Sequence, residues 1–204
     1  MSANIPYLPA LWQLFGISQE QLLPYRHREE SVVIDELIIP SNLRLSTRFH
    51  QCIRDARTML LALAGPRLPA RSWYGSRIFV TRGGTSTDRD LLGRERVIDF
   101  ARQHGFDIVD PLQLSIGDQI ATFRAAKAII GEYGSALHNS LCALRGTASH
   151  PGFIQSGLGD ACGHQTGYVF GTTTNGETDY SFEINDRDLL IAMRCMDVWV
   201  DAYR

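Results

Sequence analysis

The chain of 204 residues is 44% hydrophobic and 21% charged, the balance of a folded globular domain, which excludes a disordered or coiled-coil protein. Twenty basic and 22 acidic residues leave a net charge of -2, and without a basic patch we expect no nucleic acid among the partners. Lys127 is the only lysine, so the remaining basic residues are arginines. A GC-rich genome produces that bias without any function, but arginine also supplies the rigid, always-charged fork that binds phosphate.

No stretch approaches the roughly 20 apolar residues of a membrane span, and we expect neither a span nor a secretory signal. The four cysteines, at positions 52, 142, 162 and 195, lie far apart without a CxxC pair. This spacing favours reduced thiols in a cytoplasmic protein over a disulfide framework or a zinc site. Cys162 and His164, with His150 nearby, are the alternative metal set, but a second close pair is missing.

The first third of the chain begins with an irregular stretch and continues with a predicted strand and helix. Residues 1–30 read as an irregular lead-in with a short helix near 11–15, and Ser18 followed by Gln21 is a capping box for another short helix. The β-branched run at 31–39 predicts a strand. Apolar residues at helical spacing then predict a helix over 46–64, closed by glycine and proline.

The middle of the chain alternates strands and helices. Continuous apolar runs predict strands at 77–81, 106–109 and 128–131, and amphipathic or small-residue segments predict helices at 93–104, from 115 to about 126, and from the turn at 132–139 to 144. Strand and helix alternating at this spacing indicate right-handed βαβ units. We therefore expect an α/β fold, with a parallel sheet that has helices on both faces.

The last quarter has a different character. Residues 152–180 are rich in glycine and threonine, which predicts short strands or loops rather than helices. A final amphipathic helix is expected over 189–203, with Asp186 or Asp188 as its N-cap.

Ligands of open α/β sheets bind beyond the carboxyl ends of the strands, and this rule selects the loops at 82–84 and 132–139. In the second loop, Gly134 lets a ligand approach the backbone, Ser135 presents a hydroxyl, and the helix that follows offers free N–H groups. Arg82 in the first loop would supply the fork for a diphosphate. The alternative is that Gly134 only turns the chain, Ser135 caps the helix and Arg82 is solvated.

An ordered set of motifs resembles the core of family 61 glycosyltransferases, whose members are often described as capsular polysaccharide biosynthesis proteins. The blocks that carry the resemblance are RIFVTR at 77–82, GFDIVDP at 105–111, the helix with Asp118–Gln119, and AIIGEYGSALHN at 128–139, with weaker matches in FGISQEQLLPY, DELIIP and YSFEIN. The order and spacing of these blocks are kept over about residues 30–190.

The resemblance implies a Rossmann-like domain that forms one half of a GT-B glycosyltransferase, with residues 31–204 as the donor-binding part. It implies a nucleotide-sugar donor, a glycan acceptor, inversion at the anomeric carbon, and no metal or other cofactor. A homodimer would complete the cleft of so short a chain. The residues that match the family's donor-binding motifs are Arg82, Arg89, Gln119, Gly134, Leu137 and Asn139.

The chain departs from the family pattern at two places. Gly93–Arg94 stands where Asn-Glu is usual, with Glu95 as a shifted substitute, and Tyr133 stands where the loop usually carries histidine. An inverting transfer needs a general base on the acceptor hydroxyl, and the candidates are Glu132 and His138. Their alternative roles are structural, with Glu132 favouring a helix dipole and His138 on the surface or packed.

Other functions stay open at this point. Asp-x-Asp strings at 88–90 and 186–188 invite a metal-dependent transferase, although the second string lies where a helix N-cap is needed. The departures from the family pattern favour a non-catalytic nucleotide- or glycan-binding subunit of a polysaccharide assembly machine. An unrelated Rossmann-like oxidoreductase is a third, weaker interpretation.

Overall fold

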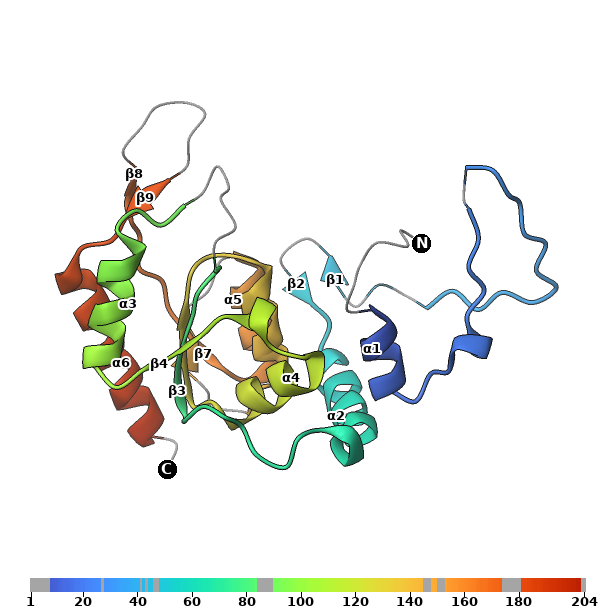
Figure 1. Ribbon diagram of the computed structural model, residues 1–204, viewed down its shortest axis with the longest axis horizontal. Coiled ribbons are helices and arrows are strands. Elements are labelled where there is room, and N and C mark those ends of the chain that lie inside the picture. The colour runs from blue at the N-terminus through green and yellow to red at the C-terminus, as the bar shows by residue number, and fades with distance from the viewer. Residues whose placement is uncertain are drawn as a thin grey trace.

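The computed structural model describes residues 8–26, 28–40, 42, 44–45, 48–83, 90–144, 148–149, 153–173 and 181–202. Within these residues the centre of the molecule is a five-stranded parallel sheet (Figure 1). Its strands are β3 (Arg77–Val80), β4 (Asp107–Val109), β5 (Ala128–Gly131), β6 (Ala148–Ser149) and β7 (Gln165–Thr166). They lie in the order β4-β3-β5-β6-β7, so the direction of winding reverses between β3 and β5. The predicted α/β class and parallel sheet are confirmed.

Helices cover both faces of this sheet, as the sequence predicts. One face carries α3 (Arg94–Gln103) and α6 (Asp186–Ala202) (Figure 1). The other face carries α4 (Ile116–Ala125) and the 3₁₀ helix η4 (Ser135–Cys142). The helices α1 (Leu8–Leu14), α2 (Ile53–Ala64) and α5 (Phe153–Cys162) lie on this second side and pack against α4 or η4. Successive β3 side chains serve the two faces in turn, because Phe79 packs under α3 and α6 while Ile78 and Val80 pack under α4. Each face therefore has its own apolar core.

Short elements complete the described chain: η1 (Gln19–Gln21), β1 (Arg44–Leu45), β2 (Arg48–Phe49), η2 (Gly65–Arg67), η3 (Pro111–Gln113), β8 (Thr172–Thr173) and β9 (Phe182–Glu183). The strands β1 and β2 form one antiparallel pair, and β8 and β9 form another. None of the helices in the described part combines the length and apolarity that a membrane crossing needs.

Caps explain where several helices begin. The capping box predicted at Ser18 and Gln21 is present, with the Ser18 N–H donating to Gln21 Oε1 at 2.8 Å. Ser115, where the sequence predicts that a helix begins, caps α4, because its Oγ accepts the N–H of Asp118 at 3.1 Å. The predicted cap of the last helix is wrong. Asn185 takes that role through Oδ1, which accepts the N–H of Asp188 at 2.8 Å, so α6 begins before the predicted position.

Three predictions about elements are wrong. Residues 31–40 form no strand and are exposed throughout, looping away from the sheet at the right of Figure 1. The helix predicted from residue 46 begins only at Ile53, because β1 and β2 come before it. Residues 153–162, expected as strand or loop, form α5. Gly159 serves helix packing there, since a Cβ on it would lie 2.3 Å from Cγ2 of Thr166.

Gly131 at the end of β5 is required by close packing. A Cβ at this position would lie 2.7 Å from Cδ2 of Leu137, 2.8 Å from the carbonyl oxygen of Val80 and 2.9 Å from the Val80 Cβ. We expect Gly131→Ala to lower the free energy of unfolding by about 1–3 kcal/mol, because strand backbone would have to move. Denaturant unfolding measures this loss.

Gly117→Ala is the matched control for Gly131→Ala. Gly117 lies within α4, and a Cβ there would make only ordinary van der Waals contacts, 3.5 Å from Cδ of Pro69 and 3.8 Å from Oγ of Ser115. We expect this substitution to leave stability unchanged or to raise it by a few tenths of a kcal/mol. Equal losses in the two variants would contradict the packing argument.

His164 is buried just after the end of α5, next to the residue that follows η4. Its Nε2 is 3.4 Å from the carbonyl oxygen of Ala143, and burial lowers the pKa of His164 to about 4, with a smaller contribution in the same direction from Arg57. An unfolded histidine titrates near 6.5. Between pH 6.5 and pH 4 the unfolded chain therefore binds a proton that the folded chain does not, and the stability of the fold decreases as the pH is lowered. This linkage amounts to about 3 kcal/mol at most.

Thermal unfolding measured from pH 7 to 4 checks this effect. Other acidic groups also change stability in this range, so the difference between wild type and His164→Asn is the relevant quantity. We expect the melting temperature of the variant to depend less steeply on pH than that of the wild type. His138→Asn, which replaces an exposed histidine, is the control and should keep the wild-type slope. Parallel curves for wild type and His164→Asn would contradict the expectation.

Candidate functional site

The two loops selected from the sequence meet at the carboxyl edge of the sheet. Strands β3 and β5 are direct neighbours, and their last residues, Val80 and Gly131, lie opposite each other. The loops that follow the two strands therefore begin side by side. The winding of the sheet reverses between them, and ligands of open α/β sheets bind in the crevice at such a point. The two loops that the carboxyl-end rule selects therefore follow neighbouring strands.

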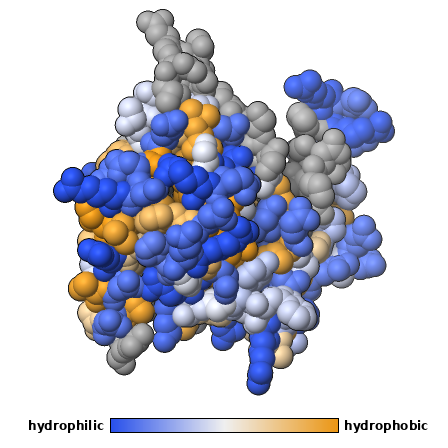
Figure 2. All heavy atoms as spheres, turned by 60° about the vertical axis from the view of Figure 1, so that its left-hand side comes forward, coloured by the Kyte–Doolittle hydropathy of each residue, from blue (hydrophilic) through white to orange (hydrophobic). Residues whose placement is uncertain are grey.

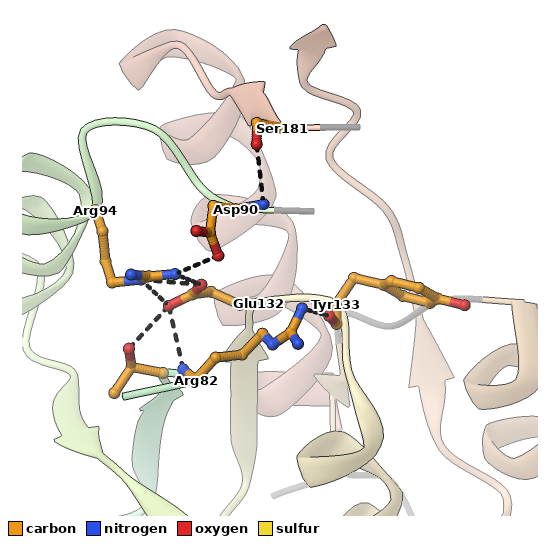
Figure 3. A network of polar contacts seen from close by, with 7 residues as sticks. Arg82, Asp90, Arg94, Glu132, Tyr133 and Ser181 are labelled. Atoms are coloured by element: carbon orange, nitrogen blue, oxygen red, sulfur yellow. Dashed lines mark hydrogen bonds and ion pairs between the residues drawn. The ribbon is translucent and has the colours of Figure 1, made fainter. Parts of the chain in front are cut away.

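Glu132, the first residue after β5, lies at the centre of a polar network (Figure 3). Its side chain is 1% exposed. Oε1 accepts hydrogen bonds from the Thr81 hydroxyl at 2.8 Å, the Arg82 backbone N–H at 3.2 Å and Arg94 Nε at 2.9 Å. Oε2 accepts from Arg94 Nη2 at 3.0 Å. Both oxygens are therefore engaged, and the carboxylate joins the end of β3 to the start of α3.

Arg94 is the cation of this network. Its guanidinium binds Glu132 with a two-pronged contact, and Nη2 also lies 3.5 Å from Asp90 Oδ1. The hydrogen bond to Glu132 is the main reason that the pKa of Arg94 is raised. The backbone N–H of Asp90 in turn donates to Ser181 Oγ at 3.3 Å (Figure 3). The network thereby ties the β9 segment to the edge of the sheet.

Gly93 explains how Arg94 reaches this position. Its φ of 65° is in the left-handed region, where glycine and asparagine are the residues found most easily. The glycine that replaces the family's usual asparagine therefore keeps the same backbone preference. The departure that matters is Arg94, which brings a cation where an acidic residue is usual.

Arg82 and Gly134 lie against each other, as the anion-site prediction requires. Nη1 of Arg82 donates to the carbonyl oxygen of Tyr133 at 3.4 Å (Figure 3). A Cβ on Gly134 would lie 3.5 Å from both Cδ and Nε of Arg82, which is van der Waals contact, so the arginine packs directly against this glycine. The arginine extends from β3 across to the loop that follows β5. Gly134 itself has an extended backbone (φ 175°).

Gln119 and Asn139 are brought together, but they bind each other. Asn139 Nδ2 donates to Gln119 Oε1 at 2.9 Å, while Gln119 Nε2 donates to the carbonyl oxygens of Pro111 at 2.8 Å and Leu114 at 3.2 Å. This arrangement joins η4 to the start of α4. A direct contact of either side chain with a donor stays a prediction.

The remaining predicted residues lie on or near η4. Ser135 begins this helix and is exposed, and His138 is exposed one turn further on. The helix is 3₁₀ rather than α, a geometry with poorer hydrogen bonds. Arg89 lies outside the described residues, as do the first two residues of the Asp-x-Asp string at 88–90.

A cavity of about 320 Å³ opens beside Glu132. Its wall is formed by the ends of β3 and β5, by α3, by the segment 168–170 and by the residues around β9. The aromatic residues in this wall are Phe79, Tyr133, Tyr168, Phe170 and Phe182. It lies on the face of the sheet that carries α3 and α6. Figure 2 turns this side of the molecule forward and shows hydrophobic residues exposed among hydrophilic ones.

Sequence reasoning missed the cavity and most of the network. Thr81, Asp90 and Ser181 lie within RIFVTR, the Asp-x-Asp string at 88–90 and YSFEIN, but nothing in those strings shows that the three residues meet. Arg94 did carry a signal, since it departs from the family pattern, but its partner is 38 positions away in the sequence.

The described residues hold no group of three or more histidine, cysteine, aspartate and glutamate side chains placed to bind a metal ion. Cys162 and His164 are both within that part of the chain, whereas His150 is outside it. In the second Asp-x-Asp string, Asp186 pairs with Arg96 and Asp188 bonds to Asn185. Both carboxylates thus serve the start of α6.

A family model described as Glycosyltransferase 61 matches residues 3–149, which is more than half of the chain. The match includes β3, β4 and β5, the two loops at their carboxyl ends, and the Arg94–Glu132 pair. It ends at β6, before α5 and the segment that closes the cavity. No curated protein matches the chain.

Proposed function

The chain belongs to glycosyltransferase family 61, and on that basis we propose that it binds a nucleotide sugar and transfers the sugar to a glycan acceptor. One observation carries the proposal: Arg82 crosses from β3 to Gly134 at the point where the winding of the sheet reverses. A diphosphate placed there would meet the arginine fork and the backbone of the following loop.

The chemistry of transfer favours this arrangement. When the bond between the sugar and the diphosphate breaks, negative charge develops on the leaving phosphate. A guanidinium fixed in advance stabilises that charge most when it is fully formed, which lowers the barrier. The proposal assigns this role to Arg82, together with Arg89 and the backbone of Gly134 and Ser135. It requires no metal ion or other cofactor.

For the general base we favour His138 over Glu132. Both oxygens of Glu132 accept hydrogen bonds and the side chain is buried, so proton removal by this residue would have to disrupt its pair with Arg94. His138 is exposed on η4 and is free of that constraint. In this proposal Glu132 is a positioning residue, because its Oε1 holds the backbone N–H of Arg82.

The finer parts of the proposal rest on the sequence resemblance. They are an inverting reaction, one half of a GT-B architecture completed by a second copy of the chain, and a role in bacterial capsular or exopolysaccharide synthesis in the cytoplasm. The acceptor would then be a growing glycan.

The test is a thermal-shift screen against UDP, GDP, CDP, ADP and their common sugar conjugates, followed by a hydrolysis and transfer assay with the donor that binds best. We expect one nucleotide family to raise the melting temperature and its sugar conjugate to be turned over, with activity retained in EDTA. If no nucleotide shifts the melting temperature, donor binding by this chain is excluded.

A non-catalytic nucleotide-binding relative is the second candidate. It is favoured by Tyr133 in place of the usual loop histidine and by Arg94 in place of an acidic residue. Nucleotide binding without hydrolysis or transfer, with several acceptors tested, would identify this case.

A further inference from the structure

The cavity beside Glu132 is chemically selective. Apart from Glu132 and the two tyrosines, 133 and 168, the side chains that line it are hydrocarbon. Glu132 is already neutralised by Arg94. A phosphate would therefore meet a carboxylate rather than a cation there, and a sugar would leave most of its hydroxyl groups without partners. The lining fits a flat ring with apolar faces.

Tyr133 connects this cavity to Arg82. Its side chain or backbone forms part of the cavity wall, and its carbonyl oxygen accepts the hydrogen bond from Arg82 Nη1. A ligand that fills the cavity and extends past Tyr133 therefore reaches the arginine. This is the order of groups in a nucleotide, with the base at one end and the phosphates at the other.

We propose that the cavity binds the base of the nucleotide and that Tyr168 and Phe170 are the residues on which it stacks. This inference rests on the proposed function, which requires a nucleotide but does not say where its base lies. The rings of Tyr168 and Phe170 stack with centroids 6.0 Å apart and an angle of 22°, so they form a preassembled aromatic surface. Phe170 is 78% exposed although it lines the cavity, so core packing does not account for it.

The experiment compares ligands with and without a base on the full chain. Isothermal titration measures the binding of UDP, GDP, CDP, ADP and inorganic pyrophosphate to wild type, Phe170→Ala, Tyr168→Ala and Phe170→Leu. Trp73→Ala is the matched control, because Trp73 is 83% exposed and precedes β3, at the opposite edge of the sheet. Phe170→Ala should melt like the wild type, since so little of its side chain is buried.

For the nucleotide that binds wild type best, we expect Phe170→Ala and Tyr168→Ala to weaken binding about tenfold, and Phe170→Leu to weaken it less. Pyrophosphate binding and the Trp73→Ala variant should be unchanged. Wild-type affinity in both alanine variants would overturn the base site while leaving the proposed function intact. Absence of nucleotide binding to wild type would overturn both. Binding of geranyl diphosphate that depends on Phe170, without nucleotide binding, would instead assign the cavity to an alkyl chain.

Discussion

Replacing Arg82 with alanine is expected to remove most of the stabilisation that a nucleoside diphosphate gives the protein. A ligand at 100 times its dissociation constant stabilises a fold by about 2.7 kcal/mol, which for a chain of this size raises the melting temperature by about 8 °C. A charged hydrogen-bonding partner contributes about 1.5–3 kcal/mol, so its loss weakens binding up to about 100-fold. The same ligand concentration should then raise the melting temperature by only about 1 °C.

The lysine variant separates charge from geometry. Arg82→Lys keeps the positive charge but loses the planar fork, so we expect binding between those of wild type and the alanine variant. Arg102→Lys and Arg194→Lys are the controls, since both arginines are exposed on helices away from the loop, and neither should affect binding. If the Arg82→Lys variant binds nucleotide as well as the wild type does, the abundance of arginine in this chain reflects base composition alone.

The three central strands were predictable because their sequence signals are local and mutually consistent. The runs that form β3 and β5 are continuously apolar, as strands buried on both faces must be, and Ser115 marks the start of α4. Alternation of these elements leaves few arrangements of a parallel sheet. The rule that ligands bind at the carboxyl edge then selected a pair of loops that do meet in the structure.

Elements that depend on distant contacts were not predictable. The run at 31–39 has the composition of a strand, but it pairs with no other strand among the described residues, and propensity alone does not form one. In α5 the glycines suggested a loop, whereas Gly159 is needed for close contact with Thr166, which no local pattern shows. Tertiary packing overrides local preference in both cases.

The candidate site was predicted in part for the same reason. Arg82 and Gly134 lie in the two loops that the sequence selects at the carboxyl ends of strands. The role of Glu132 depends instead on Arg94, which enters from the next helix, and Gln119 and Asn139 bind each other. Motif matching identifies which residues gather at a sheet edge. It does not show which of their side chains already form hydrogen bonds or ion pairs with one another.

Arg94→Ala is expected to be the most destabilising substitution at this site. It leaves the Glu132 carboxylate, 1% exposed, without its cation. Breaking a buried ion pair from one side costs about 3–5 kcal/mol, because an uncompensated charge remains inside, and this corresponds to a fall of about 10 °C in the melting temperature. Chemical denaturation and calorimetry both measure it. The double variant Arg94→Met with Glu132→Leu removes both charges and should recover much of the loss.

The chain provides a control on the same helix. Arg96 lies two residues further along α3 and pairs with Asp186, but both side chains are about half exposed. Exposed pairs contribute at most about 1 kcal/mol, so Arg96→Ala should be nearly neutral. Similar losses for Arg94→Ala and Arg96→Ala would show that the Glu132 pair is an ordinary surface contact. A large loss confined to Arg94→Ala would instead show that the Glu132 pair stabilises the fold. Weaker nucleotide binding in a Glu132→Gln variant that still folds would show in addition that Glu132 positions Arg82, since Glu132 accepts the hydrogen bond from the Arg82 backbone N–H.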